Sequence, residues 1–381
     1  MKELKYNIKM LQMADDKKDY DGNLTEEDIE NYKEVNRIFS KAESIAKLPH
    51  CVLCEKECSS FCNSHSVPKF ALSRISEDGK VSETLKSKMP LHEKSLGVKQ
   101  TGTFKLICNT CDNEKFQDYE EPSSYSANPT NKMLAQIALK NYLQMIYKRL
   151  VERELFTLLG EKYPQNKSFT EENLFIKNLD LIGYLSSLEY AQKAVKKSNY
   201  KYYHLYYYKV LDYVVPYAAQ AVVTLVGDFD DKVINDLYSL SPEYKPKDIH
   251  VAVFPLEKTS VVMLFAEDGE KRYRNFYKQF KKLSSEDQLA AVNYIVFAYT
   301  ENVFLNSKVQ NKMKENKNFI ELCGQGTDIL SEITPSTMYN YDVPSETLLS
   351  KAIKEFSLSK RHEIPNLLSR EYAISDNEKE N

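Results

Sequence analysis

The sequence predicts an α+β protein that combines a small zinc-bound domain with a larger, mainly helical domain containing a small antiparallel sheet. Three observations carry this prediction. Two Cys-x-x-Cys pairs bracket a segment rich in lysine, glycine and serine, which favours loops and short strands over helix. Apolar residues then recur at three- and four-residue steps, as in amphipathic helices. Further along, tyrosine- and valine-rich runs indicate strands.

Size and composition describe an ordinary globular protein. A chain of 381 residues favours two or three domains. The formal charge of −3 argues against binding nucleic acid or a membrane over the whole surface. Four of the seven cysteines have metal-ligand spacing, which favours a reducing, cytoplasmic location. The most apolar stretch, 210–227, contains Asp212, Pro216 and Gln220, so we expect buried protein and no membrane association.

The first region, 1–47, is expected to be a polar tail followed by one helix. Residues 25–28 resemble a capping box, and a helix to about Lys47 follows. The zinc-binding region spans 48–122, and a short linker rich in serine and proline separates it from a domain over 130–381. That domain should open with two long helices, 131–163 and 170–197, that form a helical hairpin.

The tract 200–208 concentrates six tyrosines. It can be interpreted as a platform on which bases stack, or as a strand with Tyr202, His204, Tyr206 and Tyr208 on one face. We favour the strand. More strands are expected at 218–226, 249–255 and 259–265. An amphipathic basic segment, 271–282, and a helix over 285–306 follow them.

The four paired cysteines predict a structural zinc site made of Cys51, Cys54, Cys108 and Cys111. Zinc favours four thiolate or imidazole ligands in a tetrahedron, and each Cys-x-x-Cys turn presents two sulfurs to one ion. Such a site contributes on the order of 10 kcal/mol to folding. Three other side chains could replace one of these ligands, namely His50, Cys58 and Cys62. Cys323 is expected to lie in the core.

The segment from Ser66 to Lys105 has a local excess of positive charge. It contains eight basic and four acidic residues, which leaves +4 in a chain that is negative overall. Such an excess suits a phosphate backbone, where neutralised phosphates release counterions. A solvated, lysine-rich loop explains it equally well.

One pattern resembles a known family. A Cys-x-x-Cys, then His65 with Pro68 shortly after it, then a second Cys-x-x-Cys that opens a helix with Asn113 and Lys115, is similar to the four-cysteine branch of the HNH nucleases. The resemblance covers about residues 48–122. It implies a treble-clef-like ββα-metal fold for this region.

The resemblance also implies site residues. His65 would be the general base that activates water, and Asp112 would bind Mg²⁺ or Mn²⁺ beside it. Asn113 and Lys115 would hold the phosphate or base. The local excess of positive charge, and not the resemblance, adds Lys69 and Arg74 as expected contacts to the nucleic acid. The chain departs from the family pattern where Ser64 replaces an acid or histidine, and where Lys115 and Phe116 replace a histidine or asparagine. Glu120 could supply the missing carboxylate.

We therefore expect an HNH-like, metal-dependent endonuclease that acts on nucleic acid, with DNA as the expected substrate. Its layout is similar to proteins of bacterial antiphage defence. The alternative is a non-catalytic, zinc-stabilised module that binds nucleic acid or a partner protein, in which His65 would only orient the zinc loop. A third class is a purely structural protein. Residues 130–381 would then mediate contact with a partner protein or a homo-oligomer.

Overall fold

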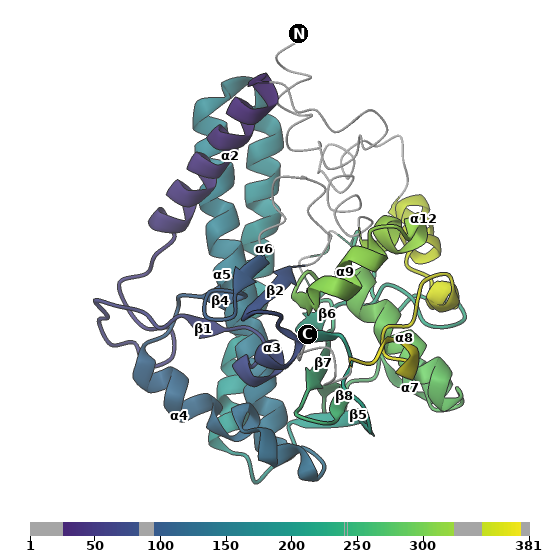
Figure 1. The fold of residues 1–381 in the computed structure, drawn as a ribbon. Helices are drawn as coiled ribbons and strands as arrows, with labels where there is room; N and C mark the ends of the chain where they lie inside the picture. The colour runs from purple at the N-terminus through teal and green to yellow at the C-terminus, as the bar shows by residue number, and fades with distance from the viewer. Residues whose placement is uncertain (1–25, 84–94, 240, 242, 324–344, 375–381) are drawn as a thin grey trace.

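The computed structural model describes residues 26–83, 95–239, 241, 243–323 and 345–374. Within this part of the chain, two long helices run side by side against a twisted sheet, and further helices cover the opposite side of the sheet (Figure 1). No described helix is both long and apolar enough to cross a bilayer. The helices are α2 (Glu26–Ile45), α3 (Lys69–Ile75), α4 (Asn109–Glu120), α5 (Asn131–Lys162), α6 (Lys167–Lys196), α7 (Arg274–Phe280), α8 (Ser285–Tyr299), α9 (Ser307–Met313) and α12 (Ser345–Glu355).

The expected helical hairpin is confirmed in α5 and α6. Thr130 caps α5, because its hydroxyl accepts a hydrogen bond from the Met133 N–H at 3.2 Å. A short turn, Pro164–Asn166, joins the helices, and α6 begins three residues earlier than expected. Helix α2 packs on α5 and matches the first expected helix. The expected cap at Thr25 lies outside the described residues.

The main sheet is antiparallel and has the strand order β3-β2-β9-β6-β7-β8-β5. A separate pair joins β1 to β4. The strands are β1 (Ser64–His65), β2 (Lys80–Glu83), β3 (Ser95–Gly97), β4 (Thr103–Phe104), β5 (Tyr203–Leu211), β6 (Tyr217–Val223), β7 (Ile249–Pro255), β8 (Ser260–Glu267) and β9 (Val303–Leu305).

The central strands are buried on both faces. Ala218 and Phe254 pack in the core that includes α3 and α5, whereas Ala219 and Val253 pack in the core that includes α8. A strand covered on both sides carries apolar residues continuously rather than alternately. This explains why β6 and β7 are buried at every position.

The structure corrects three expectations about the elements. The sheet is larger than the small one predicted, since β2, β3 and β9 extend it. The segment between the cysteine pairs contains helix α3 as well as loops and strands, so the exclusion of helix there was wrong. The helix expected over 285–306 ends at Tyr299, where the chain turns into β9.

The tyrosine tract forms a strand, but its expected single face holds only for His204 and Tyr206, whose rings both contact Tyr277 of α7. Tyr202 and Tyr208 pack on the other side. A β-bulge between Leu205 and Tyr207 shifts the register of β5 against β8. A bulge inserts an extra residue and reverses the direction of the side chains that follow. Tyr206 therefore packs toward the core of α8, and Tyr208 toward the core of α5.

A chain of buried polar side chains links the cysteine-rich region, 48–122, to the sheet. The Ser66 hydroxyl donates to the Asn302 side-chain oxygen at 2.7 Å, and the Asn302 amide donates to the Gln220 carbonyl at 2.6 Å. The Gln220 amide donates to Asn141, whose own amide meets His250 Nδ1 at 3.1 Å. Because β2 also pairs with β9, the regions on either side of the expected boundary share one core. Their independence as domains stays a prediction.

Candidate metal centre and the polar site beside it

The four predicted cysteines come together in one cluster. The sulfurs of Cys51, Cys54, Cys108 and Cys111 all lie within 4.8 Å of one another, and those of Cys54 and Cys108 are 3.9 Å apart. Within the described residues, this is the group of cysteine, histidine and acidic side chains that could hold a metal. Four sulfur donors at this spacing fit a tetrahedral zinc ion.

The backbone shapes both halves of this cluster. Glu55 has a φ of +59°, and its N–H donates to the Cys51 carbonyl at 2.8 Å, which closes the first turn. The Cys108 sulfur caps α4 by accepting from the Cys111 N–H at 3.5 Å. The start of a helix favours negative charge, so a thiolate suits this position.

The Cys51 thiol has a pKa below the usual value for cysteine. Burial raises its pKa, but hydrogen bonds from backbone N–H groups have the larger, opposite effect. With the Cys108 N–H at 3.3 Å among them, they bring the pKa down to about 7. The thiolate is the form that binds metal. The other cysteines lie elsewhere: Cys58 donates to the Ser60 carbonyl at 2.8 Å and Cys62 contacts Asp112 at 3.4 Å, while Cys323 is buried in the core as expected.

His65 lies on β1, in register with Thr103 of β4. Its Nε2 lies 2.9 Å from the Val98 carbonyl oxygen. A carbonyl oxygen only accepts hydrogen bonds, so Nε2 carries the proton. In a neutral ring, Nδ1 is then left with its lone pair. The ring is half-buried.

Asp112 lies beside Ser64, the residue that precedes His65. The Ser64 hydroxyl donates to an Asp112 carboxylate oxygen at 2.6 Å. The Lys140 ammonium, from α5, donates to the same oxygen at 2.8 Å and to the Ser64 hydroxyl at 2.9 Å. Successive residues of a strand point to opposite faces, so Ser64 and His65 leave β1 in different directions.

The Lys140 side chain is fully buried, although lysine is rarely so. Its ammonium also lies 3.1 Å from a Glu120 oxygen and 3.7 Å from the centre of the Phe116 ring. Its partners are thus two carboxylates, a hydroxyl and an aromatic face. Burial raises the pKa of Asp112, but the charge and hydrogen bond of Lys140 lower that pKa by more, so Asp112 is held as a carboxylate.

The other predicted contact residues lie on two helices, α3 and α4. Lys69 is exposed at the start of α3, and Asn113 is exposed on α4 beside the half-buried Lys115. Arg74 points into the protein, because its Nε donates to the Leu256 carbonyl at 3.2 Å.

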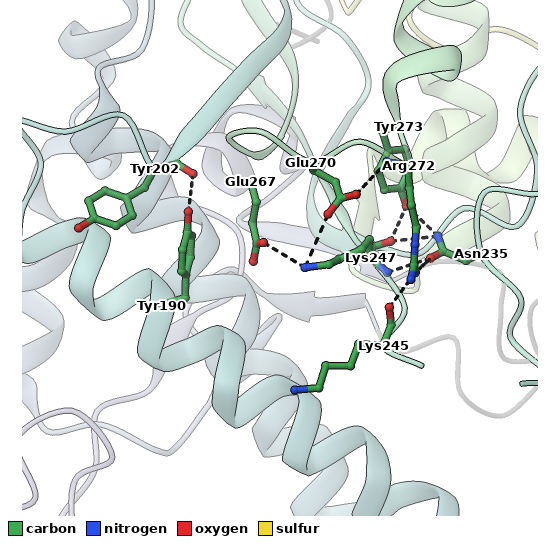
Figure 2. Close-up of polar contacts among 9 residues, drawn as sticks. All are labelled: Tyr190, Tyr202, Asn235, Lys245, Lys247, Glu267, Glu270, Arg272 and Tyr273. Carbon is green, nitrogen blue, oxygen red and sulfur yellow. Dashed lines mark hydrogen bonds and ion pairs between the residues drawn. The ribbon is translucent and has the colours of Figure 1, made fainter. Parts of the chain in front are cut away.

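A second polar cluster, which the sequence pattern does not single out, lies where β7 begins and β8 ends (Figure 2). Lys247 Nζ lies 3.3 Å from a Glu267 oxygen and 3.6 Å from a Glu270 oxygen. Arg272 donates to the Asn235 side chain at 3.0 Å. Because these charges have partners inside the cluster, we interpret it as closing the preceding loop onto the sheet.

Neither the family models nor the curated proteins and solved structures yield a match to this chain. The geometry above therefore carries the functional argument.

Sequence reasoning missed Lys140. A signal was present, because this lysine stands within the run Ile137-Ala-Leu-Lys-Asn-Tyr-Leu143, in which five of the seven positions are apolar or aromatic. A charge in such a run needs a buried partner. The partners Asp112 and Glu120 could not be named from the sequence, since neither is near Lys140 in the chain.

Proposed function

We propose that this protein is a zinc-stabilised nucleic-acid-binding module whose HNH-like centre does not cleave. The observation that carries the proposal is the buried Lys140 ammonium, which lies between Ser64, Asp112 and Glu120. It takes the place beside Asp112 where the family resemblance calls for a divalent metal.

Electrostatics oppose a second metal at Asp112. A divalent ion bound there would lie within a few ångströms of the ammonium, where repulsion in a partly buried site amounts to several kcal/mol. Displacing the ammonium instead would leave a buried charge without a partner, which costs roughly 3–5 kcal/mol. Lys140 thus supplies the positive charge itself.

Zinc would stabilise the fold of this module. The cysteine pairs tie the loop before β1 to the start of α4, and so hold β1, β4 and α4 in register. Zinc–thiolate bonds would add to the apolar core that this loop-rich segment shares with the sheet.

Basic side chains close to His65 support nucleic-acid binding. Lys99 follows Val98, whose carbonyl accepts from the His65 ring, and Lys105 directly follows β4. Lys69 lies four residues after His65 at the start of α3. All three are exposed. A phosphate backbone is the partner that exposed lysines of this kind attract, without reading sequence.

A second candidate function is metal-dependent cleavage, which the geometry of His65 favours. Val98 fixes the ring so that Nδ1 keeps its lone pair, as a general base requires. The metal would then need ligands other than an Asp112 carboxylate that already pairs with Lys140.

One pair of assays separates these functions. Zinc-loaded protein is incubated with plasmid, single-stranded DNA and RNA in Mg²⁺ or Mn²⁺, and binding to the same molecules is followed by gel shift over a salt series. We expect binding that weakens as salt rises, and no cleavage. The triple variant Lys69→Glu, Lys99→Glu, Lys105→Glu should lose binding, and His65→Ala should keep it.

The matched control is the triple variant Lys278→Glu, Lys281→Glu, Lys312→Glu, which makes the same change of charge at α7, directly after it, and on α9. It should bind like the wild type. Cleavage that depends on His65 would overturn the proposal and favour the second candidate function, metal-dependent cleavage. Salt-insensitive binding, or none, would overturn the nucleic-acid partner.

A further inference from the structure

Helix α6 carries an apolar stripe that faces away from the protein. Phe175, Leu179, Ile182 and Leu185 are 51%, 53%, 67% and 41% exposed. These positions are separated by four, three and three residues, so they lie on one side of the helix. The opposite side, with Leu181 and Leu188 among its residues, is buried.

The stripe is unusual for its concentration. The exposed large apolar residues of the described chain number nine, and four of them lie within eleven residues of α6. Single exposed apolar residues need no explanation, but a contiguous row indicates a contact surface.

We propose that this stripe binds the same stripe of a second copy of the chain, with the two α6 helices antiparallel and Ile182 at the twofold axis. In such a contact, each residue before Ile182 faces one equally far after it in the other copy. Leu179 and Leu185 lie three residues on either side, so the leucines of both copies surround the paired isoleucines.

Charge complementarity fixes the direction of pairing. Glu171 and Lys193 lie eleven residues on either side of Ile182, and both are exposed on the same side of α6 as the stripe. Antiparallel packing brings each Glu171 opposite Lys193 of the other copy, twice per dimer. Parallel packing would set glutamate against glutamate, which is unfavourable.

Small residues next to Ile182 allow the helices to approach closely. Gly183 is exposed, and a Cβ built on it would have no neighbour within 4 Å. Ser186, one turn after Ile182, is exposed as well. A glycine in a helix interior costs about 1 kcal/mol relative to alanine, and close packing of a second helix offsets this cost.

The small size of the contact is consistent with a weak dimer. Helix α6 has 30 residues and is therefore about 45 Å long. One helix pair of this length buries an area near the lower limit for specific interfaces, about 1,200 Å² in total. We expect a dimer with a dissociation constant on the order of 1–100 μM.

The test is sedimentation velocity on the full, zinc-loaded chain from about 1 to 200 μM, a range that spans the expected dissociation constant. We expect a monomer at the low end and a dimer at the high end. Ile182→Glu should stay monomeric throughout, because two like charges, one from each copy, would otherwise meet at the twofold axis in an apolar contact. The control, Val233→Glu, changes a 53% exposed valine outside α6 and should dimerise like the wild type.

A charge exchange tests the register. Glu171→Lys and Lys193→Glu should each weaken the dimer about tenfold, and the double variant should restore it. A wild type that stays monomeric to 200 μM overturns the proposal. That result is expected if another segment of the same chain covers the stripe. A dimer that survives Ile182→Glu overturns the location, and failure of the double variant to recover overturns the antiparallel register.

Discussion

Lys140 is held by side chains that lie far from it in sequence, and its removal should be costly. In Lys140→Met, the methionine keeps the apolar stem but leaves Asp112 and Glu120 without their shared cation. We expect a loss of about 3–5 kcal/mol in the free energy of unfolding, measured by urea denaturation. The double variant Lys140→Met, Asp112→Asn should recover part of this loss.

The matched control for Lys140 is Lys132→Met on the same helix. Lys132 pairs with Asp118 at the surface, where both side chains are about two-fifths exposed. Exposed pairs contribute at most about 1 kcal/mol. Equal losses in Lys140→Met and Lys132→Met would contradict the account of the buried site.

His250 should make the protein sensitive to mild acid. Burial lowers its pKa to about 3, and its Nδ1 accepts from the Asn141 amide. The unfolded chain has a histidine pKa near 6.5. Between these values the unfolded state binds the extra proton, so stability is full above about pH 6.5 and falls as pH drops toward 3.

The variant His250→Gln keeps an acceptor for Asn141 and removes the titration. We expect its free energy of unfolding to depend less on pH between about 6.5 and 4, with a slope smaller by up to about 1.4 kcal/mol per pH unit. Equal slopes for the variant and the wild type in urea unfolding at several pH values would show that His250 titrates normally.

At the residue scale, the zinc ligands could be predicted because their spacing is local. Each Cys-x-x-Cys pair brings its own two sulfurs together, so the cluster needs only two such pairs to meet. The partners of Asp112 could not be predicted, since Ser64 and Lys140 lie 48 and 28 residues away. Only the fold brings them together.

At the scale of elements, the turn before β4 is packed tightly against β9. Gly102 has a φ of +59°, and a Cβ there would lie 2.5 Å from a Phe304 ring carbon. Gly79 has a φ of +71° but no atom within 4 Å of the added Cβ. The two glycines therefore share the backbone requirement and differ only in their neighbours.

This pair makes a matched experiment. Gly79→Ala should cost about 1 kcal/mol for backbone strain alone. Gly102→Ala should cost about 1–3 kcal/mol more, because Phe304 must move within the core. Thermal and urea unfolding give both values, and similar losses for the two variants would mean that β4 and β9 are not in close contact.

The long elements could be predicted and the short ones could not. Helices α5 and α6 repeat their apolar pattern over many turns, so periodicity locates them. Strand β9 has three residues, and its partners β2 and β6 are far away in the chain. Too few residues are present to establish a period, and pairing at a distance leaves no local trace.

For the whole molecule, zinc should hold the cysteine-rich region in the shared core. Cys51→Ser removes a buried ligand, so we expect loss of zinc by elemental analysis and a melting temperature lower by several degrees or more. Cys58→Ser is the control, because Cys58 lies outside the cluster. Full zinc content in Cys51→Ser would contradict the four-cysteine site.

The central claim is that the Lys140 ammonium replaces a divalent metal beside Asp112. Its most direct test is titration of zinc-loaded protein with Mn²⁺, with free Mn²⁺ followed by electron paramagnetic resonance. We predict no stoichiometric Mn²⁺ site with a dissociation constant below about 1 mM. One tight Mn²⁺ per chain that is lost in Asp112→Asn would contradict the claim.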